Sequence, residues 1–206
     1  MTITMQRRKR LEENYWHIVI KMATDKKRIM EAIVKLADKV DARIESEIII
    51  IKGPRGEVKR NIANPKLKFH IKDKSIIISA DRFSQKEKKL VYAYAAHLKN
   101  MVEGVTEGHK YVLKICASHF PMNVSVSGNQ FIVKNFLGEK YPRTLQLSQG
   151  VNVKVDGDKI NVESADIELA GTTASDIEKL TKRAGFDPRI FQDGIYIISK
   201  DGKDIK

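Results

Sequence analysis

The chain has 206 residues, 42% of them hydrophobic, and Lys and Arg outnumber Asp and Glu to give a formal net charge of +12. A chain of this length buries one or two hydrophobic cores, and its basic excess favours a polyanionic partner, nucleic acid before an anionic membrane. No run approaches about 18 uninterrupted apolar residues, which speaks against a membrane-spanning helix, and the single cysteine, Cys116, cannot form an internal disulfide, which fits the cytosol.

Residues 1–38 are expected to form an N-terminal extension outside the repeated part of the chain. The basic run Arg7–Arg10 resembles the start of a signal peptide, but no unbroken apolar run follows it, so secretion is not expected. Apolar residues at helical spacing predict a helix over Lys26–Val40. We interpret the extension as either disordered or the product of an over-long reading frame, since Met22 and Met30 are alternative start sites.

Residues 39–105 are predicted to form a first α+β domain. A capping box at Ser84–Glu87 predicts the start of its helix, and an apolar stripe from Leu90 to Val102 predicts the face that closes the core. The turn signal Gly53–Gly56 separates the first two of its expected strands. These strands are Glu47–Lys52, Glu57–Ile62, Leu67–Ile71 and Ser75–Ser79.

Residues 106–206 are predicted to form a second α+β domain with a basic C-terminal tail. Its helix is expected at Ala174–Ala184, with Gly185 at the C′ position that ends it. The segment Asp156-Gly157-Asp158 is typical of a hairpin turn. The expected strands are Lys110–Ala117, Met122–Val126, Phe131–Asn135, Val151–Val155, Lys159–Glu163 and Gly194–Ser199.

Two short sequence signals recur at nearly one spacing. Gly56-Glu57 returns 82 residues later as Gly138-Glu139, and Ser79-Ala80-Asp81 returns 85 residues later as Ser164-Ala165-Asp166. Each copy combines hairpin-forming strands with one helix, which is typical of an α+β fold and not of alternating βαβ units. We therefore predict an α+β protein of two tandem duplicated domains, each a small antiparallel β-sheet or partial barrel packed with one α-helix.

The sequence contains no recognisable catalytic set, so we expect a binding protein that is no enzyme and needs no cofactor or metal. Cys116 and His119 have the spacing of a zinc-ligand pair, but a structural zinc site needs about four ligands and no second pair is nearby. A packed cysteine is therefore favoured. Gly53–Gly56 lacks the spacing of a phosphate-binding P-loop.

Aromatic residues near predicted turns and strand ends suggest a surface for unpaired bases. His119, Phe120, Tyr141 and Tyr196 are placed where bases could stack on their rings while Lys and Arg hold the backbone. The alternative for the phenylalanines is core or hinge packing. This alternative applies to Phe120, Phe136, Phe186 and Phe191.

Five segments, in chain order, carry a resemblance to a known family: Gly53–Gly56, Asn100–Gly108, His119–Pro121, Asn135–Lys140 and Asp193–Tyr196. Together they resemble the archaeal and eukaryotic branch of the universal large-subunit ribosomal protein six family, called nine in eukaryotes. The resemblance covers roughly residues 40–200. Residues 1–38 depart from the family pattern, which begins close to the first strand.

This resemblance implies two tandem α+β domains without enzymatic activity. It implies binding to large-subunit ribosomal RNA (rRNA), mainly by residues 106–206, near the sarcin–ricin loop and the base of the factor-binding stalk. The other expected partners are neighbouring large-subunit ribosomal proteins and, transiently, translational GTPases, in the cytoplasmic ribosome and away from membranes. The RNA-facing candidates are His119, Phe120, Lys140, Arg183, Arg189, Tyr196, Lys200 and Lys203.

A second class of function remains open on the sequence alone. A non-ribosomal RNA-binding adaptor would also be basic and without catalytic motifs. The strand around Ile48–Ile51 would serve such an adaptor if it were an exposed edge able to pair with a partner. An RNA-modifying enzyme is less favoured, because no motif supplies its pocket.

Overall fold

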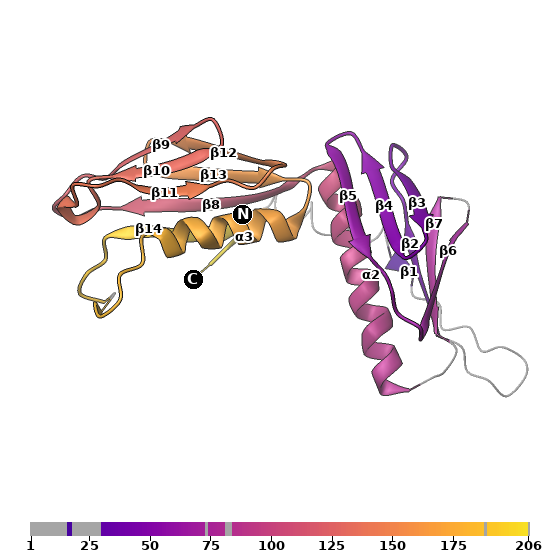
Figure 1. Cartoon of the computed structure of the whole chain (residues 1–206). Coiled ribbons are helices and arrows are strands. Elements are labelled where there is room, and N and C mark those ends of the chain that lie inside the picture. Colours follow the sequence, from indigo (N-terminus) through magenta and orange to yellow (C-terminus); the bar gives the residue numbers. More distant parts are fainter. Residues whose placement is uncertain (1–15, 18–29, 73, 81–83, 188, 206) are drawn as a thin grey trace, which may run out of the picture. The chain divides into compact units, whose positions relative to one another are not determined.

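The computed structural model describes residues 16–17, 30–72, 74–80, 84–187 and 189–205 (Figure 1). The chain divides into two compact units, Met1–Glu107 and Gly108–Lys206. Each unit combines two antiparallel sheets with one long helix. This architecture confirms the predicted α+β class.

The first unit contains a four-stranded and a three-stranded sheet, both antiparallel. The four-stranded sheet has the order β1-β2-β7-β6, with β1 at Trp16–His17, β2 at Met30–Lys35, β7 at Ser75–Ala80 and β6 at Leu67–Lys72. The three-stranded sheet has the order β3-β4-β5, with β3 at Asp41–Glu45, β4 at Ile48–Gly53 and β5 at Gly56–Asn61.

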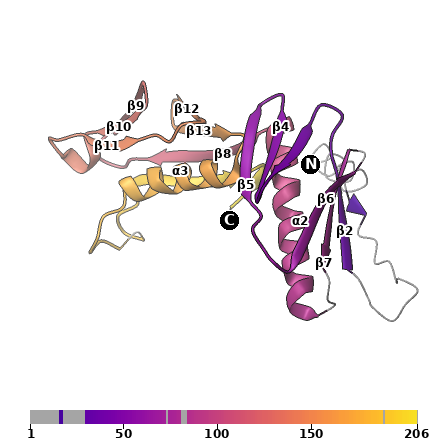
Figure 2. The ribbon, with the colours of Figure 1, turned by 45° about the vertical axis from the view of Figure 1, so that its right-hand side comes forward.

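Helix α2 (Gln85–Thr106) closes the core of the first unit. The predicted helix start at Ser84 is confirmed, because the Ser84 hydroxyl accepts a hydrogen bond from the Lys86 N–H and donates one to the Glu87 carboxylate. The helix packs against β2 and β7 of one sheet and β4 and β5 of the other (Figure 2). Alternate residues of the strands are fully buried, as the period of two requires: Ile49, Ile51, Ile76 and Ile78.

Two predictions for the first unit are wrong. Residues 30–35, assigned to the extension and to a helix over Lys26–Val40, form β2, which pairs with β7 along its whole length. Ala32 and Val34 are buried while Ile33 between them is half-buried, so burial follows the strand period. The strand around Ile48–Ile51 is no free edge either, because β4 pairs with β3 and β5. Residues 1–15 and 18–29 of the extension lie outside the described residues.

The second unit contains a five-stranded and a three-stranded sheet. The five-stranded sheet has the order β12-β13-β8-β14-β15, with β12 at Val151–Asp156, β13 at Lys159–Ser164, β8 at His109–Cys116, β14 at Gly194–Lys200 and β15 at Lys203–Asp204. The three-stranded sheet has the order β11-β10-β9, with β11 at Arg143–Gln146, β10 at Gln130–Lys134, β9 at Asn123–Ser127 and a 3-10 turn, η1, at Phe136–Gly138.

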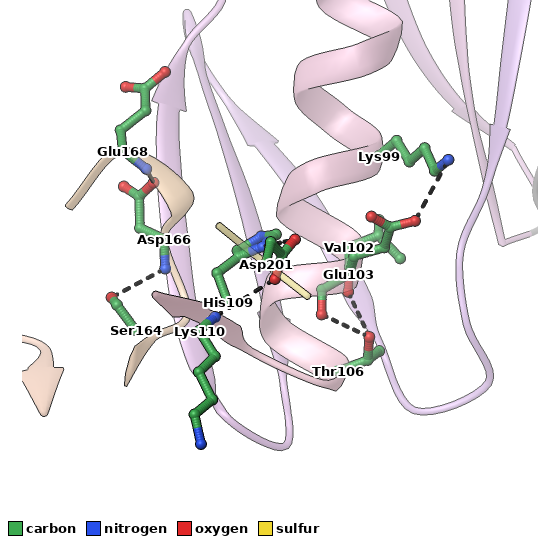
Figure 3. Close-up of polar contacts among 10 residues, drawn as sticks. All are labelled: Lys99, Val102, Glu103, Thr106, His109, Lys110, Ser164, Asp166, Glu168 and Asp201. Carbon is green, nitrogen blue, oxygen red and sulfur yellow. Dashed lines mark hydrogen bonds and ion pairs between the residues drawn. The ribbon is translucent and has the colours of Figure 1, made fainter. Parts of the chain in front are cut away.

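Helix α3 (Ile167–Leu180) begins earlier and ends earlier than predicted. The Asp166 carboxylate caps it by accepting a hydrogen bond from the Glu168 N–H at 2.8 Å (Figure 3). The first two turns of the helix were not predicted, because Gly171, Thr172 and Thr173 are poor helix formers. Gly185 lies beyond the end of the helix and is not its C′ residue. The helix covers a core that includes Leu113, Phe131, Phe136, Ile160, Val162, Ile177 and Ile195.

The two units repeat one topology. The strand orders β2-β7-β6 and β8-β13-β12 correspond, as do β3-β4-β5 and β9-β10-β11, and each set is followed or covered by one helix. The sheet register equates Ala80 with Ser164, because each is the last residue of its strand and pairs with the first residue of β2 or β8. The two Ser-Ala-Asp segments are therefore offset by one residue, since Ser164 corresponds to Ala80 and not to Ser79.

Candidate nucleic-acid interface

Segments from three separate parts of the sequence meet at one end of the second unit. We call the surface formed by residues 118–121, 135–143, 181–187 and 189–196 the loop surface. Six of the eight predicted RNA-facing residues lie on it: His119, Phe120, Lys140, Arg183, Arg189 and Tyr196.

The first segment is held to the start of β14 by a carboxylate. The Ser118 hydroxyl lies 2.9 and 3.0 Å from the two Asp193 carboxylate oxygens, and the Ser118 N–H also donates to Asp193. The next residue, Gly194, pairs with Cys116 of β8. A Cβ on Gly194 would lie 3.2 Å from the Tyr196 hydroxyl oxygen. The Asp193–Tyr196 segment therefore has a structural role in joining β14 to the segment after β8.

His119 and Phe120 form an edge-to-face pair with ring centroids 4.9 Å apart. The Phe120 ring also packs on the loop after β10, because a Cβ on Gly138 would lie 3.5 Å from it. The side-chain amide of Asn135 donates to the Pro121 carbonyl at 3.0 Å. Phe120 is thus packed on one side and exposed on the other, which combines the two alternatives that the sequence left open.

Arg143 holds the loop between β10 and β11 against the end of helix α3. Its guanidinium donates to both Glu139 carboxylate oxygens, at 2.8 and 2.6 Å, and to the Leu180 carbonyl at 2.6 Å. It also lies 4.4 Å from the centre of the buried Phe136 ring. The hydrogen bonds from Arg143 are the main reason that the pKa of Glu139 lies below its ordinary value.

The same loop presents Lys140 and Tyr141 to solvent. Tyr141 is 85% exposed, the most exposed large hydrophobic residue among those described. Lys140 is exposed as well. The left-handed backbone at Asn135 and Leu137 bends the loop outward around the buried Phe136. The sequence suggests Tyr141 as a stacking ring, although Tyr141 is not among the eight predicted RNA-facing residues.

The segment after α3 carries a second cluster of rings. The Arg183 guanidinium lies 4.0 Å from the centre of the Phe186 ring, and Phe186 meets Phe191 edge to face at 4.8 Å. Phe186 is 37% exposed and Phe191 47% exposed. For both phenylalanines the sequence suggests core or hinge packing as the alternative to base stacking. The signal that could have separated them from core residues is their setting among Arg183, Asp187 and Arg189 on a segment rich in turn residues.

Tyr196 connects this cluster to the sheet. It lies on β14 and is partly buried. Burial is the first cause that raises the pKa of its hydroxyl, followed by the nearby Cys116, Asp193 and Glu178. The phenol is therefore a neutral group near pH 7. It offers a ring and a hydroxyl to a ligand, and no charge.

Lys200 and Lys203 are not brought to the loop surface. They pair with each other in the β14–β15 hairpin. Lys200 is six residues beyond Gly194 on the same strand, a distance of about 20 Å in an extended chain. This hairpin is held to β8 by Asp201, whose carboxylate lies 2.9 Å from Nδ1 of the buried His109 (Figure 3).

Within the described residues, no group of three or more His, Cys, Asp or Glu side chains could hold a metal ion. Cys116 is a free, half-buried cysteine. None of the helices described is long and apolar enough to cross a membrane.

Two stretches of the chain, residues 37–108 and 120–194, match the family described as ribosomal protein L6. The chain belongs to the ribosomal protein L6 family. This confirms the family resemblance. The double match corresponds to the two units of the fold, and confirms the tandem duplication. Ribosomal protein L6 is a structural component of the ribosome, so the expectation that the chain is not an enzyme is also confirmed.

Curated archaeal relatives agree with this assignment over most of their length. The chain is 38% identical to large ribosomal subunit protein uL6 of Methanococcus vannielii over 170 residues, which is 82% of this chain and 93% of the relative. It is 38% identical to uL6 of Methanosarcina mazei, covering 81% and 95% of the two chains. The uL6 of Natronomonas pharaonis is also 38% identical, covering 82% and 95%.

Proposed function

We propose that this protein is a structural constituent of the large ribosomal subunit in the cytoplasm and binds large-subunit rRNA mainly through residues 106–206. In this proposal it lies near the sarcin–ricin loop and the base of the factor-binding stalk, beside other large-subunit proteins and close to translational GTPases. The loop surface is the observation that supports RNA binding by this protein. There, exposed rings and basic side chains from three parts of the sequence converge on one end of the second unit.

The charge on the loop surface explains how a nearly neutral domain can bind RNA. Residues 106–206 carry 14 basic and 13 acidic side chains. The loop surface itself nevertheless has more basic than acidic side chains: Lys140, Arg143, Lys182, Arg183 and Arg189 against Glu139, Asp187 and Asp193. Glu139 is also paired with Arg143. The basic side chains Lys140, Lys182, Arg183 and Arg189 are exposed. Phosphates would therefore meet mainly positive charge.

The test is the binding of the full chain to an rRNA fragment that contains the sarcin–ricin loop, measured over a range of salt concentrations. The affinity is expected to fall steeply with salt, because bound phosphates release counterions. Replacing Arg183 and Arg189 together with Ala is expected to weaken binding roughly tenfold and to lower the salt slope by about two. Lys200→Ala should cost less, since Lys200 lies at the other end of β14.

Two lysines provide controls that, replaced together, remove the same charge as the double arginine variant and, replaced singly, the same charge as Lys200→Ala. Lys154→Ala changes an exposed strand residue of the same unit, and Lys88→Ala changes helix α2 of the first unit. Both should bind almost as the unchanged chain does. Equal losses in all variants, or equal affinity for a random duplex, would contradict the proposed surface. Co-sedimentation with the large subunit at moderate salt separates a ribosomal protein from a free RNA-binding adaptor.

A further inference from the structure

The loop surface surrounds a pocket of about 380 Å3. Its apolar lining comes from the 3-10 turn, the segment after α3 and the start of β14: Phe136, Leu137, Phe186, Phe191, Ile195 and Tyr196. Four of these six residues carry flat aromatic rings. The volume lies at the lower end of the range for small-ligand sites, which suits one planar group and not a folded peptide.

The rim of the pocket is positively charged towards solvent. Lys182 and Arg183 line it and are exposed. The charged lining residues are three basic ones, Lys179, Lys182 and Arg183, and two acidic ones, Glu178 and Asp193. Glu178 accepts from the Ile197 N–H at 3.3 Å and Asp193 from Ser118. The Arg183 guanidinium is held over the Phe186 ring at 4.0 Å. An apolar aromatic pocket with a fixed cation at its mouth complements a flat base attached to a phosphate.

We propose that this pocket takes one unstacked nucleotide of the bound rRNA, with its base among the rings of Phe186, Phe191 and Tyr196 and its phosphate on Arg183 and Lys182. The proposal rests on the proposed function, because it names the part of the RNA that this surface holds. Of the polar lining residues, Thr181 already accepts from the Ile195 N–H and donates to the Glu178 carbonyl. Recognition then depends mainly on stacking, which tolerates any base.

The experiment combines a protein variant with single abasic sites in the same rRNA fragment. Removing the base that enters the pocket should weaken binding of the unchanged chain roughly fivefold to a hundredfold. Phe191→Ala should weaken binding of the intact RNA by a similar factor. The two losses should not add, because both remove the same contact.

Matched variants show whether the ring itself is needed. Phe191→Leu keeps apolar bulk without a ring and should bind like Phe191→Ala, whereas Phe191→Tyr should bind like the unchanged chain. Ile190→Ala removes the neighbouring apolar side chain, which is 74% exposed and does not line the pocket, and should have little effect. Phe191 is itself half-exposed, and unchanged thermal unfolding would establish that its variants fold.

The outcomes separate this proposal from the proposed function. If the chain binds the rRNA fragment with steep salt dependence but no abasic site couples to Phe191→Ala, the nucleotide pocket is wrong while RNA binding stands. If the chain does not bind the fragment, both are wrong. If Phe191→Ala leaves RNA binding unchanged and instead abolishes self-association of the chain, the pocket belongs to an interface with a second copy and the proposal is overturned.

Discussion

The two units differ in how the last hairpin of their three-stranded sheet is held to the helix. In the first unit the loop between β4 and β5 has two residues, and the Arg55 N–H donates to the Val105 carbonyl near the end of α2. In the second unit the loop between β10 and β11 is longer, and the Arg143 side chain donates to the Leu180 carbonyl at the end of α3. Both loops are thus tied to the last turn of their helix.

The unit with the larger net charge is not the unit with more exposed hydrophobic residues. Residues 40–105 have the larger basic excess, with 14 basic and 8 acidic side chains. Most of the exposed large hydrophobic residues described nevertheless lie on the loop surface of the second unit: Phe120, Tyr141, Phe186, Ile190 and Phe191. Of these five residues only Tyr141 lies on the β10–β11 loop, so the exposed rings come from several segments of the second unit.

The largest expected effect is that of Gly53→Ala on the first unit. A Cβ at this position would lie 2.8 Å from both the carbonyl oxygen and a methyl carbon of Val105, so the loop must move away from α2. We expect a loss of about 2–3 kcal/mol of unfolding free energy. Residue-resolved hydrogen exchange should show faster opening in the first unit only. Gly138→Ala in the equivalent loop meets ordinary contacts and should cost about 1–2 kcal/mol from its φ of +78°.

A smaller effect is expected for the arginine that ties down the second loop. Arg143→Ala removes three hydrogen bonds of a partly exposed side chain and should cost about 1–2 kcal/mol in urea unfolding. Arg143→Lys should not restore this stability, because an ammonium group cannot make the paired bonds to Glu139. Arg55→Ala in the first unit should change stability by less than about 0.5 kcal/mol, since only its backbone makes the contact. Equal losses at Arg55 and Arg143 would show that the two loops are held alike.

The smallest effect is a pH dependence in the β14–β15 hairpin. The hydrogen bond from His109 is the main cause that lowers the pKa of Asp201 from its ordinary value of 3.8. A carboxylate with a lowered pKa stabilises the fold above its unfolded pKa, and this contribution is lost as the pH falls through the folded value. Asp201→Asn should therefore cost about 1 kcal/mol at pH 7, less than a buried pair because Asp201 is partly exposed. The difference in unfolding free energy between Asp201→Asn and the unchanged chain should become smaller below about pH 3.8. A constant difference from pH 7 to pH 3 would contradict this account.

Local sequence signals predicted the elements whose structure depends on neighbouring residues. The helix start at Ser84, the turn at Gly53–Gly56 and the hairpin at Asp156–Lys159 were all predicted, because each depends on a few adjacent residues. Strand β3 was missed, since its charged sequence becomes a strand only by pairing with β4. The predicted start of helix α3 was too late, because Gly171 weakens the helical signal. The structure favours glycine at this position because Tyr111 packs against it.

The sequence by itself determined the α+β class and the family, because these depend on local patterns and short motifs. It also indicated the duplication, although the repeated Ser-Ala-Asp segments are one residue out of structural register. Only the tertiary structure decided that residues 30–35 form a strand. Their apolar residues fit a helix as well as a strand, and pairing with β7 selects the strand. The tertiary structure also decided which of the candidate RNA-facing residues lie together. Phe120, Lys140, Arg183 and Phe191 are separated in sequence, and the contacts of Arg143, Asp193 and Thr181 bring their segments to one surface.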